Sequence, residues 1–157
     1  MKPWREACEA AVRTFSDADA IRFWGKAHET PQGERPIFNY RYEHTLAVVK
    51  TARWLCPQVG ADLDIVEAAC WLHDCVKRLK DPSSKDTHAQ DASVKVPEIL
   101  AGTDFPAAKI PAVQHAIEAI QQLRRWRDLA GVKVAAVLDA RLEAPGYEDN
   151  IAHVSRL

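Results

Sequence analysis

The sequence of 157 residues lacks a long apolar run and a strong excess of charge of either sign. No stretch approaches the roughly 18 consecutive apolar residues of a membrane-spanning helix, and the first residues show no signal-peptide pattern. The formal net charge of −1 offers no general attraction to nucleic acid or to an anionic membrane. These absences predict a cytoplasmic protein whose partners include neither a nucleic-acid polymer nor a membrane.

Paired cysteine motifs, internal repeats, low-complexity segments and convincing alternating strands are also missing. The four cysteines are Cys8, Cys56, Cys70 and Cys75. Because none of them forms a CxxC pair, we expect reduced thiols packed in the core of an intracellular protein. The length fits one domain, so a single domain over residues 1–157 is expected.

What the sequence does contain is helical periodicity with short polar connections. Helices are expected over about residues 3–28 (in one or two pieces), 40–55, 64–77, 88–101, 106–124 and 132–143. Ser16 and Asp17 favour a break in the first helix, and turn-forming residues predict a loop over 30–36. Asp64 with Glu67 three residues later resembles a capping box. The prediction is an all-α, single-domain bundle of about six to seven helices.

The segment 65–77 carries the most informative chemistry, because it is apolar on nearly every side except at His73 and Asp74. Such a helix is expected to be buried, and an unpaired carboxylate in a buried position is strongly unfavourable. A salt bridge, a hydrogen-bond network or a metal ion is the usual remedy. Adjacent helical residues lie about 100° apart, so both side chains can reach one point between them, as ligands of a metal ion do.

His44 is the natural partner of this pair. It lies near the start of the preceding predicted helix, on a face shared with Val48, Thr51 and Leu55, whereas His73 lies near the end of the next helix. Antiparallel packing of the two helices would bring these ends together. The alternative is that each histidine is an ordinary core or surface residue.

Three stretches together resemble the HD superfamily of metal-dependent phosphohydrolases, whose motif order is H…HD…D on a helical bundle. They are Asn39-Tyr40-Arg41-Tyr42-Glu43-His44, Gly60-Ala61-Asp62-Leu63 and Trp71-Leu72-His73-Asp74-Cys75-Val76-Lys77. The resemblance covers residues 37–143. It implies a divalent metal ion (Mn, Mg, Co, Ni, Fe or Zn) held by His44, His73, Asp74 and Asp139.

The resemblance also implies an activity. A metal-bound water would attack the phosphorus of a nucleotide or another small phosphomonoester, with Asp74 and Lys77 as catalytic residues. Arg41 and Lys77 can neutralise phosphate charge, although surface charge at helix ends is the simpler interpretation of both. His88 and His115 match positions that imply a second metal ion or a substrate contact.

Two positions depart from the family pattern. The usual last ligand directly precedes a basic residue, whereas here Ala140 separates Asp139 from Arg141. An offset of one residue turns a helical side chain by about 100°, so Asp139 is either a ligand or an exposed carboxylate. Ile120 stands where many relatives carry a histidine, which weakens the case for a second metal ion. The chain also ends soon after this segment, which predicts either an open pocket or one closed by a second subunit in a homodimer.

Three functions are therefore compared. A phosphohydrolase is the first expectation. The irregular segment at Asp139 favours an alternative, a catalytically weak or inactive HD-fold module that binds a small phosphorylated ligand. His88 and His115 leave open a di-iron oxygenase of HD type, and Ile120 speaks against it.

Overall fold

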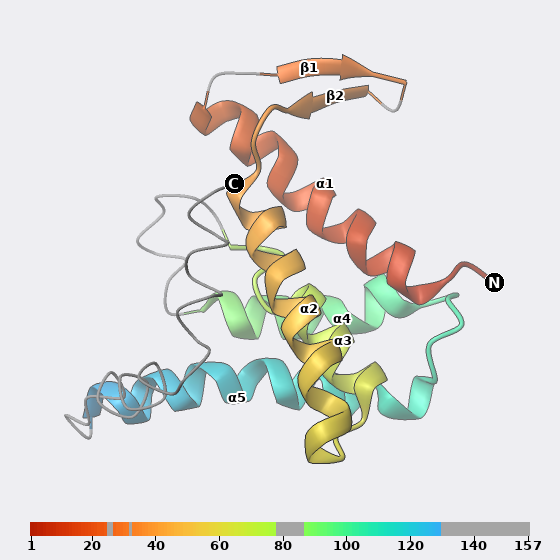
Figure 1. Ribbon diagram of the computed structural model, residues 1–157, viewed down its shortest axis with the longest axis vertical. Helices are drawn as coiled ribbons and strands as arrows, with labels where there is room; N and C mark the ends of the chain where they lie inside the picture. Colours follow the sequence, from red (N-terminus) through yellow and green to blue (C-terminus); the bar gives the residue numbers. More distant parts are fainter. Residues whose placement is uncertain (25–26, 32, 78–86, 130–157) are drawn as a thin grey trace. The chain divides into compact units, whose positions relative to one another are not determined.

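A computed structural model describes residues 1–24, 27–31, 33–77 and 87–129 (Figure 1). The chain divides into two compact units, Met1–Gln121 and Gln122–Leu157. Of the second unit, only residues 122–129, the last turns of a helix, are described. The expectation of one domain over residues 1–157 stays a prediction.

The described elements are α1 (Trp4–Trp24), β1 (Ala27–Thr30), β2 (Gly33–Pro36), α2 (Tyr40–Val59), α3 (Leu63–Leu72), α4 (His88–Leu100), the short 3-10 turn η2 (Ala107–Lys109) and α5 (Ile110–Leu129). The all-α fold class is confirmed, with five α-helices in the described residues rather than six to seven. The helix expected over 132–143 lies outside the described residues. None of the described helices is long and apolar enough to cross a lipid bilayer.

Helix α1 is continuous, so the predicted break at Ser16 and Asp17 is wrong. These polar side chains are used in tertiary contacts instead of capping a second helix. The amide nitrogen of Asn39 donates to Ser16 Oγ (2.8 Å) and to Asp17 Oδ1 (2.7 Å), and Arg35 Nη1 donates to Asp17 Oδ2 (3.0 Å). The end of the hairpin and the start of α2 are thereby tied to α1.

The predicted loop over residues 30–36 is also wrong, because most of it belongs to a β-hairpin. Strands β1 and β2 pair antiparallel, with Ala27 opposite Pro36 and Thr30 opposite Gly33. Gly33 has φ 102°, a left-handed conformation that favours glycine. The turn-forming residues were recognised, but strands of four residues are too short to show a convincing alternating pattern.

Helices α2 and α3 are defined by side-chain and glycine caps. The Asn39 side chain accepts a hydrogen bond from the Tyr42 backbone N–H (3.0 Å), and Gly60 ends α2 with φ 66°. Asp62, rather than Asp64, caps α3 by accepting from the backbone N–H groups of Asp64 and Ile65. The capping residue was therefore misplaced by two positions.

The core of the first unit is built from buried apolar residues of all five described helices, together with Cys75 and Phe105 from the connections. Its buried members are Trp4, Cys8, Val12, Val49, Ala68, Ala69, Trp71, Leu72, Cys75, Ala89, Ala92, Val96, Leu100, Phe105, Val113 and Ile117. The most extensive helix–helix contact joins α2 and α3, and α3 returns along α2 after the short turn at 60–62 (Figure 1). The end of α3 is thus held beside the beginning of α2.

Candidate metal centre

The His-Asp pair lies in a turn that follows α3. The helix ends at Leu72, so the expected continuation to Lys77 is wrong. The N–H of His73 still bonds to Ala69 O (2.9 Å), but the next bonds tighten to three-residue spacing, from Cys75 N to Leu72 O and from Lys77 N to Asp74 O (both 3.1 Å). This turn, rather than a regular helix, directs the two side chains.

The structure brings His44 of α2 to this turn. One ligand atom from each of His44, His73 and Asp74 lies within 4.8 Å of the other two. The His44 and His73 ring centroids are 5.6 Å apart, with the ring planes at 61°. His73 and Asp74 are buried, and His44 is half-buried. Antiparallel packing of α2 on α3 therefore produces the convergence that the sequence predicted.

The orientation of His73 is set by the backbone. Its Nδ1 lies 2.8 Å from the carbonyl oxygen of Cys70. A carbonyl oxygen only accepts hydrogen bonds, so Nδ1 carries a proton, and in the neutral form of the ring Nε2 would be the nitrogen that binds a metal ion. A histidine held in this way is arranged as metal-ligating histidines commonly are.

Asp74 is surrounded by positive and titratable groups. Its Oδ2 accepts from Arg41 Nη1 (2.8 Å) and Lys77 Nζ (3.3 Å), and His88 Nε2 lies 3.3 Å from Oδ1. Burial by itself raises the pKa of Asp74, but the charges of His73, Lys77, Arg41 and His88 outweigh burial and hold the pKa below its usual value. Asp74 is therefore an ionised carboxylate at neutral pH.

One oxygen of this carboxylate is open. Asp74 Oδ1 is buried and has no hydrogen-bond partner among the described residues. The nearby His88 nitrogen is at ion-pair distance but outside hydrogen-bond geometry. Two imidazoles and a carboxylate with an open buried oxygen fit a divalent first-row metal ion, with coordination positions left for other ligands.

The other predicted site residues differ in whether they lie beside Asp74. Arg41, Lys77 and His88 contact Asp74, whereas His115 is exposed on α5 without a described contact to it. Asp139 lies outside the described residues. The structure therefore places three of the five accessory candidates beside the His-Asp turn.

The face of α2 that carries His44 differs from expectation. The buried stripe of this helix consists of Arg41, Thr45, Val49, Ala52 and Cys56. The face shared by His44, Val48, Thr51 and Leu55 is half-buried or exposed. The periodicity of that face was correctly recognised, but the neighbouring stripe is the one that packs.

Sequence reasoning missed Tyr40. Its ring lies parallel to that of His44, with an interplanar angle of 11° and centroids 6.2 Å apart. The spacing of four residues on a helix is a signal that could have identified the pair, because residues four apart lie on the same face.

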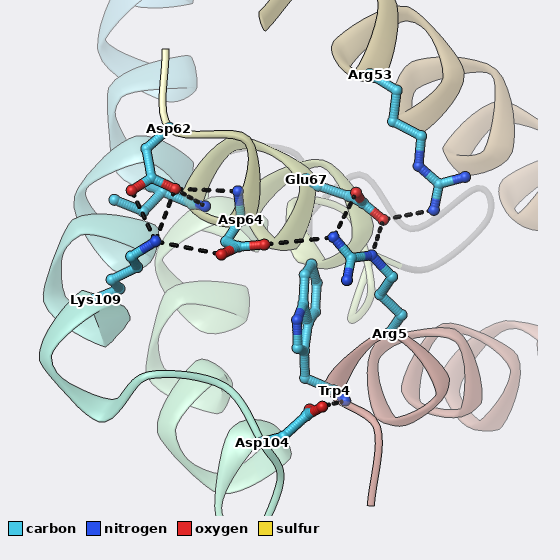
Figure 2. Close-up of polar contacts among 9 residues, drawn as sticks. Trp4, Arg5, Arg53, Asp62, Asp64, Glu67, Asp104 and Lys109 are labelled. Carbon is cyan, nitrogen blue, oxygen red and sulfur yellow. Dashed lines mark hydrogen bonds and ion pairs between the residues drawn. The ribbon is translucent and has the colours of Figure 1, made fainter. Parts of the chain in front are cut away.

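A second buried carboxylate, Glu67 on α3, was also misinterpreted. It does not serve in a capping box; instead it accepts hydrogen bonds from Arg5 Nε (2.9 Å), Arg5 Nη2 (3.3 Å) and Arg53 Nη2 (2.6 Å). Figure 2 shows the two guanidinium groups reaching Glu67 from α1 and α2. Burial raises the pKa of Glu67, but the hydrogen bonds from Arg53 and Arg5 outweigh burial and lower the pKa below its usual value.

Comparison with known proteins gives one match. A family model described as HD domain matches residues 41–143, a range that contains His44, His73 and Asp74. Neither the curated proteins nor the solved structures that were searched yielded a match. HD domains bind divalent metal ions and are generally metal-dependent hydrolases. Because the match spans more than half of the chain, the protein belongs to the HD domain family of metal-dependent phosphohydrolases.

Proposed function

We propose that the protein hydrolyses a nucleotide or another small phosphomonoester with the help of a divalent metal ion held by His44, His73 and Asp74. The observation that carries this proposal is the convergence of their three ligand atoms within 4.8 Å of one another. Asp74 Oδ1 supports it further, because this buried oxygen accepts no hydrogen bond from the described residues and lies 3.3 Å from the ring nitrogen of His88, so a metal ion could supply the partner it lacks.

The proposed metal ion is one of Mn, Mg, Co, Ni, Fe and Zn. When bound, such an ion polarises a phosphoryl oxygen and lowers the pKa of a coordinated water, which is the proposed nucleophile. Asp139 is proposed as a fourth ligand. The residues of the chain define the environment in which this chemistry would occur: His73 is held in one tautomer by the Cys70 carbonyl, and Asp74 is kept ionised by its cationic neighbours.

Arg41 and Lys77 are proposed to bind the substrate phosphate. Both now pair with Oδ2 of Asp74, at 2.8 and 3.3 Å, so both positive charges are held within reach of the candidate centre. A guanidinium group has five N–H donors and an ammonium has three, which leaves donors for phosphate oxygens after each has bonded to Asp74. Lys77, the more exposed of the two, is the proposed catalytic residue beside Asp74.

His88 supports a second candidate role at the same centre. Its Nε2 lies 3.3 Å from the open oxygen of Asp74, a position suited to a second metal ion or to a substrate contact. The alternative of a di-iron oxygenase of HD type depends on His88 and His115, of which His88 lies beside Asp74 and His115 is exposed on α5, and Ile120 speaks against it. We therefore favour the hydrolase.

An inactive phosphate-binding module is the outcome if the protein binds metal and phosphate without turnover. A homodimer and a cytoplasmic location stay predictions.

The test combines metal analysis with a substrate panel. The purified protein is stripped of metal, titrated with Mn²⁺, Co²⁺ or Ni²⁺, and assayed for phosphate release from nucleotides and sugar phosphates. We expect a saturable thermal shift with at least one ion and metal-dependent phosphate release. His73→Ala should abolish both, whereas His28→Ala on the exposed face of β1 should change neither. Absence of any metal response in the wild type would overturn the proposal.

A further inference from the structure

The first residue of α2, Tyr40, presents a large exposed ring beside the candidate centre. Tyr40 is 55% exposed, and Phe38 and Ile37, two and three residues earlier, are also exposed at 48% and 63%. The Tyr40 ring is nearly parallel to that of His44 at 6.2 Å, and His44 is 5.6 Å from His73. The Tyr40 ring is therefore next to His44, and His44 is next to His73, so an accessible aromatic face lies close to the His-Asp turn.

A neighbouring tyrosine shows what a structural aromatic residue looks like in this region. The hydroxyl of Tyr42 donates to Glu9 Oε1 (2.6 Å), and the Arg13 guanidinium lies over its ring at 3.6 Å from the centroid. Both the polar and the aromatic groups of Tyr42 are thus used within the fold. The Tyr40 hydroxyl has no hydrogen bond among the described residues, and more than half of its surface remains accessible.

Helix geometry explains why this ring is available at the centre. Residues four apart lie on the same helix face, so Tyr40 and His44 are stacked one turn from each other. Because side chains tilt towards the N-terminus of a helix and Tyr40 is the first residue of α2, no earlier turn of this helix covers its ring.

We propose that Tyr40 forms a stacking subsite for an aromatic ring attached to the substrate phosphate, so that the centre prefers nucleotides to phosphates that lack a ring. This inference rests on the proposed function, because it assumes that the phosphate binds near His44 and His73. Stacking on an exposed aromatic side chain is tolerant of base identity, since every base has a π-face. The subsite would therefore select for the presence of a base rather than for a particular base.

The experiment compares two ligands that differ only by the base. Adenosine 5′-monophosphate and ribose 5-phosphate are titrated calorimetrically into full-length protein loaded with Mn²⁺, and kcat/KM is measured for each. We expect wild type to prefer the nucleotide by about tenfold to a hundredfold, from the usual strength of base–aromatic stacking. Tyr40→Ala should remove this preference by raising Kd and KM for the nucleotide alone.

Two matched variants control for other roles of the ring. Tyr40→Phe retains the aromatic face and should retain the preference. Trp54→Ala removes another exposed aromatic residue of α2, 68% exposed and more than three turns further along the helix, and should leave both ligands unaffected. The Mn²⁺ affinity of each variant is measured in parallel. A loss of metal affinity in Tyr40→Ala, with both ligands weakened equally, would make Tyr40 a positioning residue for His44 and overturn the subsite.

The outcomes separate this inference from the proposed function. Equal binding and equal turnover of the two ligands by the wild type would overturn the subsite and leave the hydrolase in place. A nucleotide preference in binding that disappears in Tyr40→Ala, without phosphate release from either ligand, would support the subsite and contradict the hydrolase. Failure of the wild type to bind either ligand would contradict both.

Discussion

Two buried carboxylates, Glu67 and Asp74, lie seven positions apart in the same apolar segment and have different surroundings. Glu67 is 1% exposed, and its two oxygens accept three guanidinium hydrogen bonds from Arg5 and Arg53. Asp74 is 3% exposed, and from the described residues only its Oδ2 accepts hydrogen bonds, donated by Arg41 and Lys77. Both oxygens of Glu67 therefore accept hydrogen bonds, whereas Oδ1 of Asp74 accepts none from the described residues.

The basic side chains around the two carboxylates also differ, both in their exposure and in their chemistry. Arg5 and Arg53 have side chains that are 44% and 48% exposed, so water can solvate their charges if Glu67 is lost. Asp74 has two imidazoles as neighbours, His73 and His88, and imidazole nitrogens can bind metal ions as well as protons. A buried carboxylate with saturated oxygens links helices, whereas one with an open oxygen and imidazole neighbours can take a ligand.

The largest expected effect is on metal affinity. Asp74→Asn replaces a charged ligand by a neutral amide and should weaken Mn²⁺ binding by more than about 100-fold, because a direct ligand matters more than the partners that orient it. Calorimetric titration with Mn²⁺ measures the change. Glu67→Gln is the matched control and should bind Mn²⁺ like the wild type. Equal metal affinity in Asp74→Asn and wild type would place the metal site elsewhere.

The second effect is on stability. Glu67→Gln removes the charge that holds α1 and α2 to α3 and should lower the free energy of unfolding by about 2 kcal/mol. The loss is limited because the two arginines are half-exposed and can be hydrated. Urea unfolding of metal-free protein measures the change, with Trp54→Ala as an exposed control on α2. A Glu67→Gln variant as stable as the wild type would show that these ion pairs contribute no net stability.

The smallest effect is the acid dependence of that same contribution. The pKa of Glu67 is lowered below its usual value of 4.5, so the folded state holds its proton less tightly than the unfolded state does. Its stabilising contribution is complete above the unfolded pKa and is lost as the pH falls through the folded pKa. The difference in unfolding free energy between wild type and Glu67→Gln should therefore shrink below about pH 4.5. A difference that grows with acidity would contradict this sign.

Several local expectations were wrong for a common reason. Ser16 and Asp17 have the residue types of a helix start, but Asn39 and Arg35, about twenty positions away, use their side chains. Glu67 stands where a capping box would place it, but its partners come from α1 and α2. Residue type and short-range spacing predict what a side chain can do, and a distant partner in the fold determines what it does.

Sequence by itself determined the helical class, the family resemblance now confirmed, and the candidates His44, His73 and Asp74. These properties depend on periodicity and motif spacing over short stretches, which the order of residues encodes directly. Only the tertiary structure decided that Asp74 Oδ1, unlike the oxygens of Glu67, accepts no hydrogen bond from the part of the chain that is described, and that the accessible ring of Tyr40 lies against His44. Burial and hydrogen-bond saturation depend on which side chains the packing of α1, α2 and α3 brings together, and those residues are up to 62 positions apart in the chain.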